Sequence, residues 1–383
     1  MRDIIEIHLP QSQIGNRRKL LVYRYSPNAD NGSPGTRRRA YLQASLHADE
    51  LPGLLLNYHL IKLLDQADAK GEILEDIIVV PYANPIGLAQ HFFGLHQGRF
   101  CFDSGVNFNR DYLDLDKLIS SKIEKDLKLD DENHNVMIIR KAMIEAIDED
   151  GAFDEEAVMK KELLKLACVA DIALDLHCDS EALLYMFTHD DLWPQLSDLA
   201  AEIGSSCHLL SGLSGGNPFD EALSCPWQSL KQRYKDYPIP MACQSATIEL
   251  RGEGDVSHEF ASKDSISFYK FLQRRGYIAG AVGPIPNLLR DATPLTGVEM
   301  IMPTKPGIVC LNVKLGDFVN AGDVVCEIID IENPYAQKEE LKCRTSGLIF
   351  SIFKNRYCKP GHFILKVSGD QPLPWRKGKL LTA

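Results

Sequence analysis

The strongest constraint on the fold is a regular alternation of strand-like and helix-like segments. Residues 38–46 and 73–85 contain apolar runs typical of buried strands, and between them residues 51–66 place leucines at helical spacing. Residues 163–176 indicate the end of a helix followed by a short buried strand, and residues 246–250 indicate another strand. This order predicts an α/β fold built on a doubly wound mixed sheet with a largely parallel core.

A charged block interrupts this pattern. Residues 114–165 contain 15 acidic and 9 basic residues and no proline, which gives −6 of the total net charge of −11. We expect helices inserted between two core elements, either as a solvated appendage, which we favour, or as a lid or oligomer contact. Apolar residues recur at helical spacing at Val136, Ile139, Met143 and Ile147, so at least one of these helices packs on an apolar surface.

Composition excludes several classes of protein. A chain that is 45% hydrophobic and 25% charged is typical of globular proteins. The net charge of −11 argues against nucleic-acid binding, which needs a basic surface. No apolar run approaches the roughly 18–20 residues that cross a bilayer, the N-terminus lacks the apolar core of a secretory signal, and the ten cysteines form no CxxC pair. We therefore expect a cytoplasmic protein with no nucleic-acid or membrane partner.

The sequence changes character near residue 290. Beyond it, β-branched segments alternate with turns, and residues 307–328 resemble residues 347–367. Two similar halves predict a small all-β sandwich or barrel module. We therefore expect two domains, one over residues 1–290 and a β-rich one over residues 291–383.

The second of these domains resembles the biotinyl/lipoyl carrier fold. Its units share a Gly-Asp-x-Val-x-x-Gly-Asp turn, which is present here at residues 316–323. The hairpin that would present a modified lysine, residues 337–340, lacks the methionines or aspartate that flank the lysine in that family. A structural or oligomerising module is therefore favoured over a swinging-arm carrier.

Side chains that can bind metal occur at the expected carboxyl ends of strands, where chemistry gathers in α/β sheets. His47 and Glu50 stand three residues apart at a strand–helix junction and can converge on one ion. His177 follows an apolar run and shares a strand face with Asp175. Two histidines and one glutamate around an open position are a common catalytic zinc set. For His177 alone, a hydrogen-bonded core histidine is the alternative.

Glu249 is a carboxylate within an apolar strand, which is costly to bury unless it is paired or functional. An ion pair with Arg251 and a role as general base beside a metal-bound water are equally favoured. Near the same sheet edge, Arg99, Asn109 and Arg110 add polar groups and fixed cations, and the planar fork of arginine suits a carboxylate or a developing oxyanion.

Together these motifs resemble the succinylglutamate desuccinylase/aspartoacylase family, within the zinc carboxypeptidase fold. The ordered set is His-x-x-Glu, Asn-Pro-x-Gly at residues 84–87, Arg, Asn-Arg, Asp-Leu-His and Thr-x-Glu, over about residues 40–290. The resemblance implies one zinc ion per chain. It also implies roles for seven residues: His47, Glu50 and His177 as zinc ligands, Glu249 as the catalytic glutamate, Arg99 as the oxyanion-stabilising arginine, and Asn109 with Arg110 as a clamp for a substrate carboxylate.

The resemblance predicts a zinc-dependent amidohydrolase that cleaves an N-acyl amino acid or a similar small carboxylate-bearing amide. One alternative is a metallocarboxypeptidase that acts on a peptide or a cell-wall stem, since the same residues would serve a C-terminal carboxylate. Another is a non-catalytic scaffold with the β-rich domain as its working part. A substrate-positioning tyrosine could be Tyr234 or Tyr237, and a homo-oligomer is left open.

Overall fold

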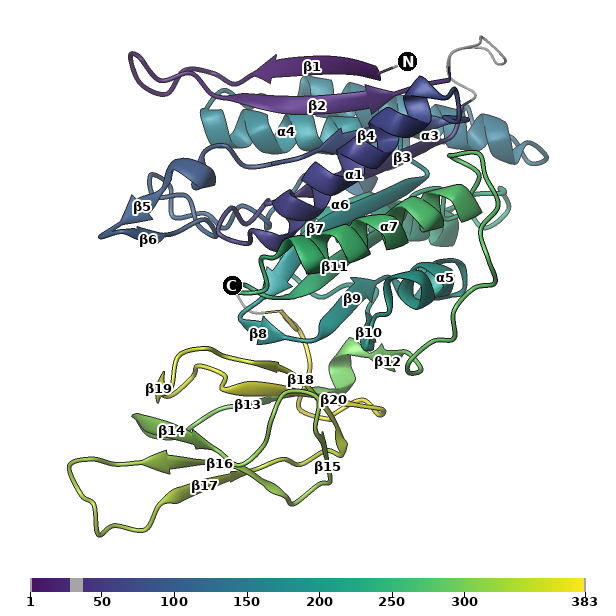
Figure 1. Ribbon diagram of the computed structural model, residues 1–383. Coiled ribbons are helices and arrows are strands. Elements are labelled where there is room, and N and C mark those ends of the chain that lie inside the picture. Colours follow the sequence, from purple (N-terminus) through teal and green to yellow (C-terminus); the bar gives the residue numbers. More distant parts are fainter. Residues whose placement is uncertain (1, 28–36, 382–383) are drawn as a thin grey trace.

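A large mixed sheet forms the centre of the computed structural model, which describes residues 2–27 and 37–381. In these described residues, nine strands pair in the order β1-β2-β4-β3-β7-β11-β9-β10-β12 (Figure 1). The strands are β1 (Arg2–His8), β2 (Lys19–Tyr25), β3 (Arg39–Ala44), β4 (Asp76–Val80), β7 (Ile172–Asp179), β9 (Leu184–Thr188), β10 (Cys207–Leu210), β11 (Gln244–Gly252) and β12 (Thr293–Pro294). The central strands β4, β3, β7 and β11 are parallel, whereas β1–β2, β2–β4 and β9–β11 pair antiparallel. The predicted mixed sheet with a parallel core is confirmed.

Helices cover both faces of this sheet (Figure 1). One face carries α1 (Pro52–Ala69), α5 (Trp193–Ile203) and α7 (His258–Arg274), and the other carries α2 (Leu115–Ile123), α3 (Glu132–Glu149), α4 (Glu155–Ala167) and α6 (Phe219–Arg233). The leucines at helical spacing in α1, among them Leu56, Leu60 and Leu64, are fully buried. Each helix thus buries one apolar stripe against the sheet.

The favoured interpretation of residues 114–165 as a solvated appendage is wrong. Helices α2, α3 and α4 belong to the core, because Ile119, Ile139, Met143 and Leu163 are buried in the same apolar cluster as strands of the sheet. The average composition of the block conceals this arrangement, because charged residues outnumber those of the narrow apolar stripes. The charged residues lie on the sides of the helices that face away from the sheet.

The later strands form two further antiparallel sheets. One joins β13 (Val298–Ile301), β20 (Leu365–Gly369), β18 (Gly347–Ile352) and β15 (Phe318–Val319), and the other joins β17 (Glu339–Lys342), β16 (Val324–Ile329), β14 (Gly307–Leu311) and β19 (Tyr357–Cys358). The two similar segments exchange one strand each, since β15 of the first pairs with β18 of the second and β19 pairs with β14. Apolar residues of both sheets share one buried cluster.

Short elements connect these parts. The strand β8 (Glu181–Ala182) lies between β7 and β9 in the chain and pairs with β18, so it links the first part of the molecule to the later strands. The remaining elements are the strands β5 (His91–Phe92) and β6 (Leu95–His96) and the 3₁₀ helices η1 (Gly87–Ala89), η2 (Asp190–Leu192) and η3 (Leu295–Gly297). Among the described residues, no helix has the length and apolar character needed to span a membrane.

Candidate functional site

The loop that follows β3 carries His47 and Glu50. The strand was expected to run to residue 46 but ends at Ala44. Ser45 then adopts φ of 61°, a left-handed conformation that is uncommon for a residue with a side chain. This turn directs the chain out of the sheet, so that both His47 and Glu50 lie at the carboxyl end of a central parallel strand.

Two further segments hold this loop in place. Asn84 donates a hydrogen bond from Nδ2 to the carbonyl oxygen of Leu46 at 2.9 Å, and its Oδ1 accepts one from the Gly87 N–H at 2.7 Å. The Gly98 carbonyl oxygen accepts a hydrogen bond from the Ala48 N–H at 2.9 Å. The Asn-Pro-x-Gly motif therefore holds the backbone beside His47 in place through hydrogen bonds of Asn84.

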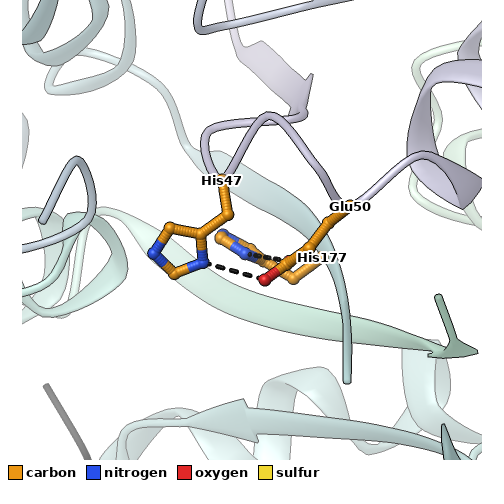
Figure 2. Close-up of side chains that lie close together, drawn as sticks. All are labelled: His47, Glu50 and His177. Carbon is orange, nitrogen blue, oxygen red and sulfur yellow. Dashed lines mark hydrogen bonds and ion pairs between the residues drawn. The ribbon is translucent and has the colours of Figure 1, made fainter. Parts of the chain in front are cut away.

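The structure brings His47, Glu50 and His177 together, as the sequence predicted. One ligand atom from each lies within 4.8 Å of the other two, and all three residues are buried (Figure 2). Glu50 Oε1 lies 3.0 Å from His47 Nδ1, and Glu50 Oε2 lies 2.8 Å from His177 Nδ1. Two imidazole nitrogens and a carboxylate converging in this way fit a divalent cation such as zinc.

Outer contacts orient both rings. Asp175 Oδ2 lies 2.8 Å from His177 Nε2, and Asp175 Oδ1 accepts a hydrogen bond from Gln43 Nε2 at 3.0 Å. Asn107 Oδ1 lies 2.9 Å from His47 Nε2. Because these oxygens can accept a hydrogen bond from each Nε2, each Nδ1 is directed at Glu50 and, once deprotonated, could offer its lone pair to a metal ion. Sequence reasoning assigned no role to Gln43 or Asn107, although Asn107 lies two residues before the predicted Asn109.

The charges of the cluster depend on one another. Burial raises the pKa of the Glu50 carboxyl, but the neighbouring imidazoles outweigh burial and hold that pKa well below its usual value. Burial lowers the pKa of His177, but Asp175 and Glu50 outweigh it and raise that pKa well above the usual value. Burial and the Arg99 guanidinium lower the pKa of His47. Glu50 is therefore held as an ionised carboxylate between the two rings.

Glu249 lies beside this cluster, because it is the register partner of His177 on the adjacent strand β11. Burial, followed by the charge of Glu50, raises the pKa of Glu249 to about 8. Its Oε2 is enclosed and has no hydrogen-bond partner in the described part of the chain. The alternative of an ion pair with Arg251 is wrong, since a bulge follows Glu249 and Arg251 pairs instead with Asp264 of α7.

The remaining predicted residues also reach this region. Arg99 lies 3.3 Å from His47 Nε2 through one guanidinium nitrogen and 3.4 Å from Glu50 Oε1 through another. Asn109 Nδ2 lies 3.5 Å from His177 Nε2. Arg110 is buried and donates to the Asn109 carbonyl oxygen at 2.7 Å.

One cavity contains most of these side chains. Its lining includes His47, Arg99, Asn109, Arg110, His177 and Glu249. Tyr234 and Tyr237 are not among the described residues that line it, and the Tyr234 hydroxyl donates instead to the Ser120 carbonyl oxygen at 2.5 Å. Lys366 of β20 and Leu381 also line it. Sequence reasoning missed both, because no local pattern ties the end of the chain to His177.

Comparison with known proteins finds a family model that matches part of the chain. Residues 36–136 match the family model of the succinylglutamate desuccinylase/aspartoacylase catalytic domain. The family resemblance predicted from the sequence is thereby confirmed. The search of curated proteins finds no match.

Solved structures share the fold. A protein from Shewanella frigidimarina NCIMB 400 assigned to this family is 22% identical, with a TM-score of 0.80 over 97% of this chain and 98% of that one. Another from Shewanella amazonensis SB2B is 23% identical, with a TM-score of 0.81 over 96% and 98%. The ectoine utilisation protein EutE (DoeB) from Ruegeria pomeroyi is 15% identical, with a TM-score of 0.66 over 96% and 95%. At these identities the likeness establishes the fold alone.

Proposed function

We propose that this chain is a zinc-dependent amidohydrolase that releases the amine from an N-acyl amino acid or a similar small amide bearing a carboxylate. The observation that carries the proposal is the convergence of His47, Glu50 and His177, with Glu249 in register beside His177. His47 Nδ1, Glu50 and His177 Nδ1 would hold one zinc ion per chain. When bound, zinc would supply a Lewis acid and lower the pKa of a nearby water.

Glu249 is the general base of this proposal. Its enclosed carboxyl has a pKa raised toward neutrality, which suits a group that must both accept and return a proton. In its ionised form, Glu249 would take a proton from the water that attacks the amide carbonyl. It would then give that proton to the departing amine.

The arginines supply the fixed positive charge. Arg99 lies against the metal-ligating side chains, so its guanidinium would stabilise the negative charge that develops on the carbonyl oxygen. Arg110, with Asn109, would bind the substrate carboxylate and hold the scissile bond near His177. Because a peptide C-terminus also carries a carboxylate, the same residues would serve a metallocarboxypeptidase.

The wider assignments are proposed with the activity. We propose that residues 1–290 form the hydrolase domain and residues 291–383 an all-β module of biotinyl/lipoyl type, and that the protein is cytoplasmic. Residues 1, 28–36 and 382–383 lie outside the described residues. Lys366 and Leu381 line the cavity, which supports a part for the module in shaping the site.

The first test replaces the proposed base. Glu249→Gln keeps the shape of the side chain but cannot accept the proton, so we expect kcat to fall by about 10³-fold while zinc is retained. Activity on N-acyl amino acids and zinc content by elemental analysis are measured together. The matched control is Glu259→Gln on the exposed start of α7, which should change neither. Full activity in Glu249→Gln with zinc bound would overturn the assigned role.

A second measurement separates the candidate activities. N-acyl amino acids and dipeptides with free C-termini are compared as substrates of the zinc-loaded wild-type protein. Preference for acyl amino acids supports the deacylase, and preference for dipeptides supports the carboxypeptidase. A purified protein that takes up no zinc would support the scaffold and contradict both enzymes.

A further inference from the structure

A second group of polar side chains lines the same cavity and has no part in the proposed hydrolysis. It comes from the residue after β9, the loop before α6 and the first turn of α6 (Figure 1). The group consists of His189, Ser214, Asp220 and Glu221, which we call the acidic wall.

Three atoms of the acidic wall have no hydrogen-bond partner within residues 2–27 and 37–381: Glu221 Oε2, Ser214 Oγ and His189 Nε2. Their residues are only 7%, 1% and 3% exposed. Buried polar atoms are nearly always paired in folded proteins. Because all three residues line one cavity, a ligand that enters it is the natural partner.

The hydrogen bonds that these side chains already make show which donor and acceptor atoms remain for a ligand. Glu221 Oε1 accepts a hydrogen bond from the Ser214 N–H at 2.9 Å, which leaves Oε2 as an acceptor. His189 Nδ1 accepts a hydrogen bond from the Asp191 N–H at 3.0 Å, so the proton of the neutral ring is on Nε2, which can donate. The acidic wall therefore presents a carboxylate oxygen, a hydroxyl and one ring N–H.

The charge of the acidic wall favours a cation. Asp220 and Glu221 are adjacent, and burial followed by the charge of Glu221 raises the pKa of Asp220 to about 7. Burial also raises the pKa of Glu221, against the opposing effects of the neighbouring Ser214 and of the charges of Arg110 and His189. A positively charged group bound here would relieve the repulsion between the two carboxylates.

We propose that the acidic wall is a specificity subsite that selects N-acyl amino acids carrying a second, positively charged amino group. Glu221 Oε2 and Ser214 Oγ would accept hydrogen bonds from the ammonium group, and His189 Nε2 would donate to an oxygen of the same substrate. This inference rests on the proposed function, since it assumes that the substrate carboxylate approaches Arg110 in the same cavity.

The test compares Nα-acetylornithine with Nα-acetylnorleucine, which has the same chain length but ends in a methyl group. Because a hydrogen bond to a charged group is stronger than one to a neutral group, we expect kcat/KM to favour acetylornithine by at least about tenfold. Glu221→Gln should abolish most of this preference, through a rise in KM for acetylornithine that is much larger than any change in KM for acetylnorleucine. Glu145→Gln on the exposed side of α3 is the matched control and should keep the preference.

Binding measurements separate this inference from the proposed function. Calorimetry on Glu249→Gln, which should not turn over, measures affinity for both ligands with and without Glu221→Gln. Selective binding of acetylornithine that is lost with Glu221→Gln supports the subsite even if the wild-type protein hydrolyses neither compound. If the protein hydrolyses these compounds without preferring acetylornithine, or prefers Nα-acetylglutamate, the proposed subsite is wrong. The proposed hydrolase activity would still be supported. If Glu221→Gln lowers kcat/KM equally for all substrates, the proposed subsite is also wrong, because that result indicates a structural role for Glu221.

Discussion

At the scale of single residues, the proposed metal site depends on side chains that would not touch the metal. Asp175 and Asn107 each accept from the Nε2 of one histidine, which leaves both Nδ1 atoms directed at Glu50. Gln43 in turn holds Asp175 from the neighbouring strand β3. The orientation of the two histidines therefore depends on Asp175, on the same strand as His177, and on Gln43 and Asn107 from other parts of the chain.

Asp175→Asn tests this dependence. An amide oxygen is a weaker acceptor than a carboxylate, so the His177 ring should be held less firmly, and zinc affinity should fall by about 10- to 100-fold. Competition with a chelating dye measures the dissociation constant, and circular dichroism checks that the fold is kept. Asp236→Asn, an exposed change outside the cavity lining, is the control. Unaltered zinc affinity in Asp175→Asn would contradict the positioning role.

At the scale of elements, the loop between β3 and α1 is held by close backbone contact. A Cβ atom placed on Gly98 would lie 2.1 Å from the Asp49 nitrogen and 2.6 Å from the Ala48 carbonyl carbon. No side chain fits in that space, so the segment that carries Arg99 approaches the loop that carries His47 only because residue 98 is glycine.

Gly98→Ala is expected to displace this loop and separate His47 and Glu50 from His177. Because small displacements of reacting groups reduce rates steeply, kcat/KM should fall by about 100-fold, together with zinc content. Gly151→Ala is the matched control, since a Cβ there meets nothing within 4 Å. Equal zinc content and activity in the two variants would show that the loop tolerates the displacement.

At the scale of the whole molecule, the last strands are tied to the central sheet beside the site. Asp179, two residues after His177, accepts hydrogen bonds from Lys366 Nζ at 2.7 Å, Ser351 Oγ at 2.7 Å and Tyr185 Oη at 2.8 Å. Burial raises the pKa of Asp179, but Lys366 outweighs burial and lowers that pKa to about 2. One largely buried ion pair thus connects β7 with β20.

Lys366→Met should lower the free energy of unfolding by about 3 kcal/mol, because it leaves the Asp179 carboxylate buried without its cation. Urea unfolding measures the loss. The double variant Asp179→Asn/Lys366→Met should recover most of it, since the uncompensated charge is gone. A double variant no more stable than Lys366→Met would show that the charge pair is not the cause.

The pH dependence of stability follows from the same pair. The pKa of Asp179 is lower in the folded state than the value of about 3.9 expected in the unfolded chain. Its contribution is therefore fully present above about pH 4 and is lost as the pH falls toward 2. The double variant should lack this part of the acid dependence.

The sequence by itself determined the parallel core of the sheet, because strand periodicity constrains neighbouring residues directly. The three-residue spacing of His47 and Glu50 is likewise local, whereas His177 was assigned to the proposed metal site by the resemblance of the ordered motifs to a known family. The position of Glu249 beside His177 was also accessible, since parallel strands place their carboxyl ends at one edge.

Only the tertiary structure decided which distant groups pair. Arg251 turns to Asp264 rather than to Glu249, Lys366 reaches Asp179 across 187 residues, and α2 to α4 pack on the sheet despite their charge. Such choices depend on how whole surfaces fit and on which buried charges find a partner. The sequence pattern of a single element shows neither which surface it will pack against nor which distant charge will pair with its own.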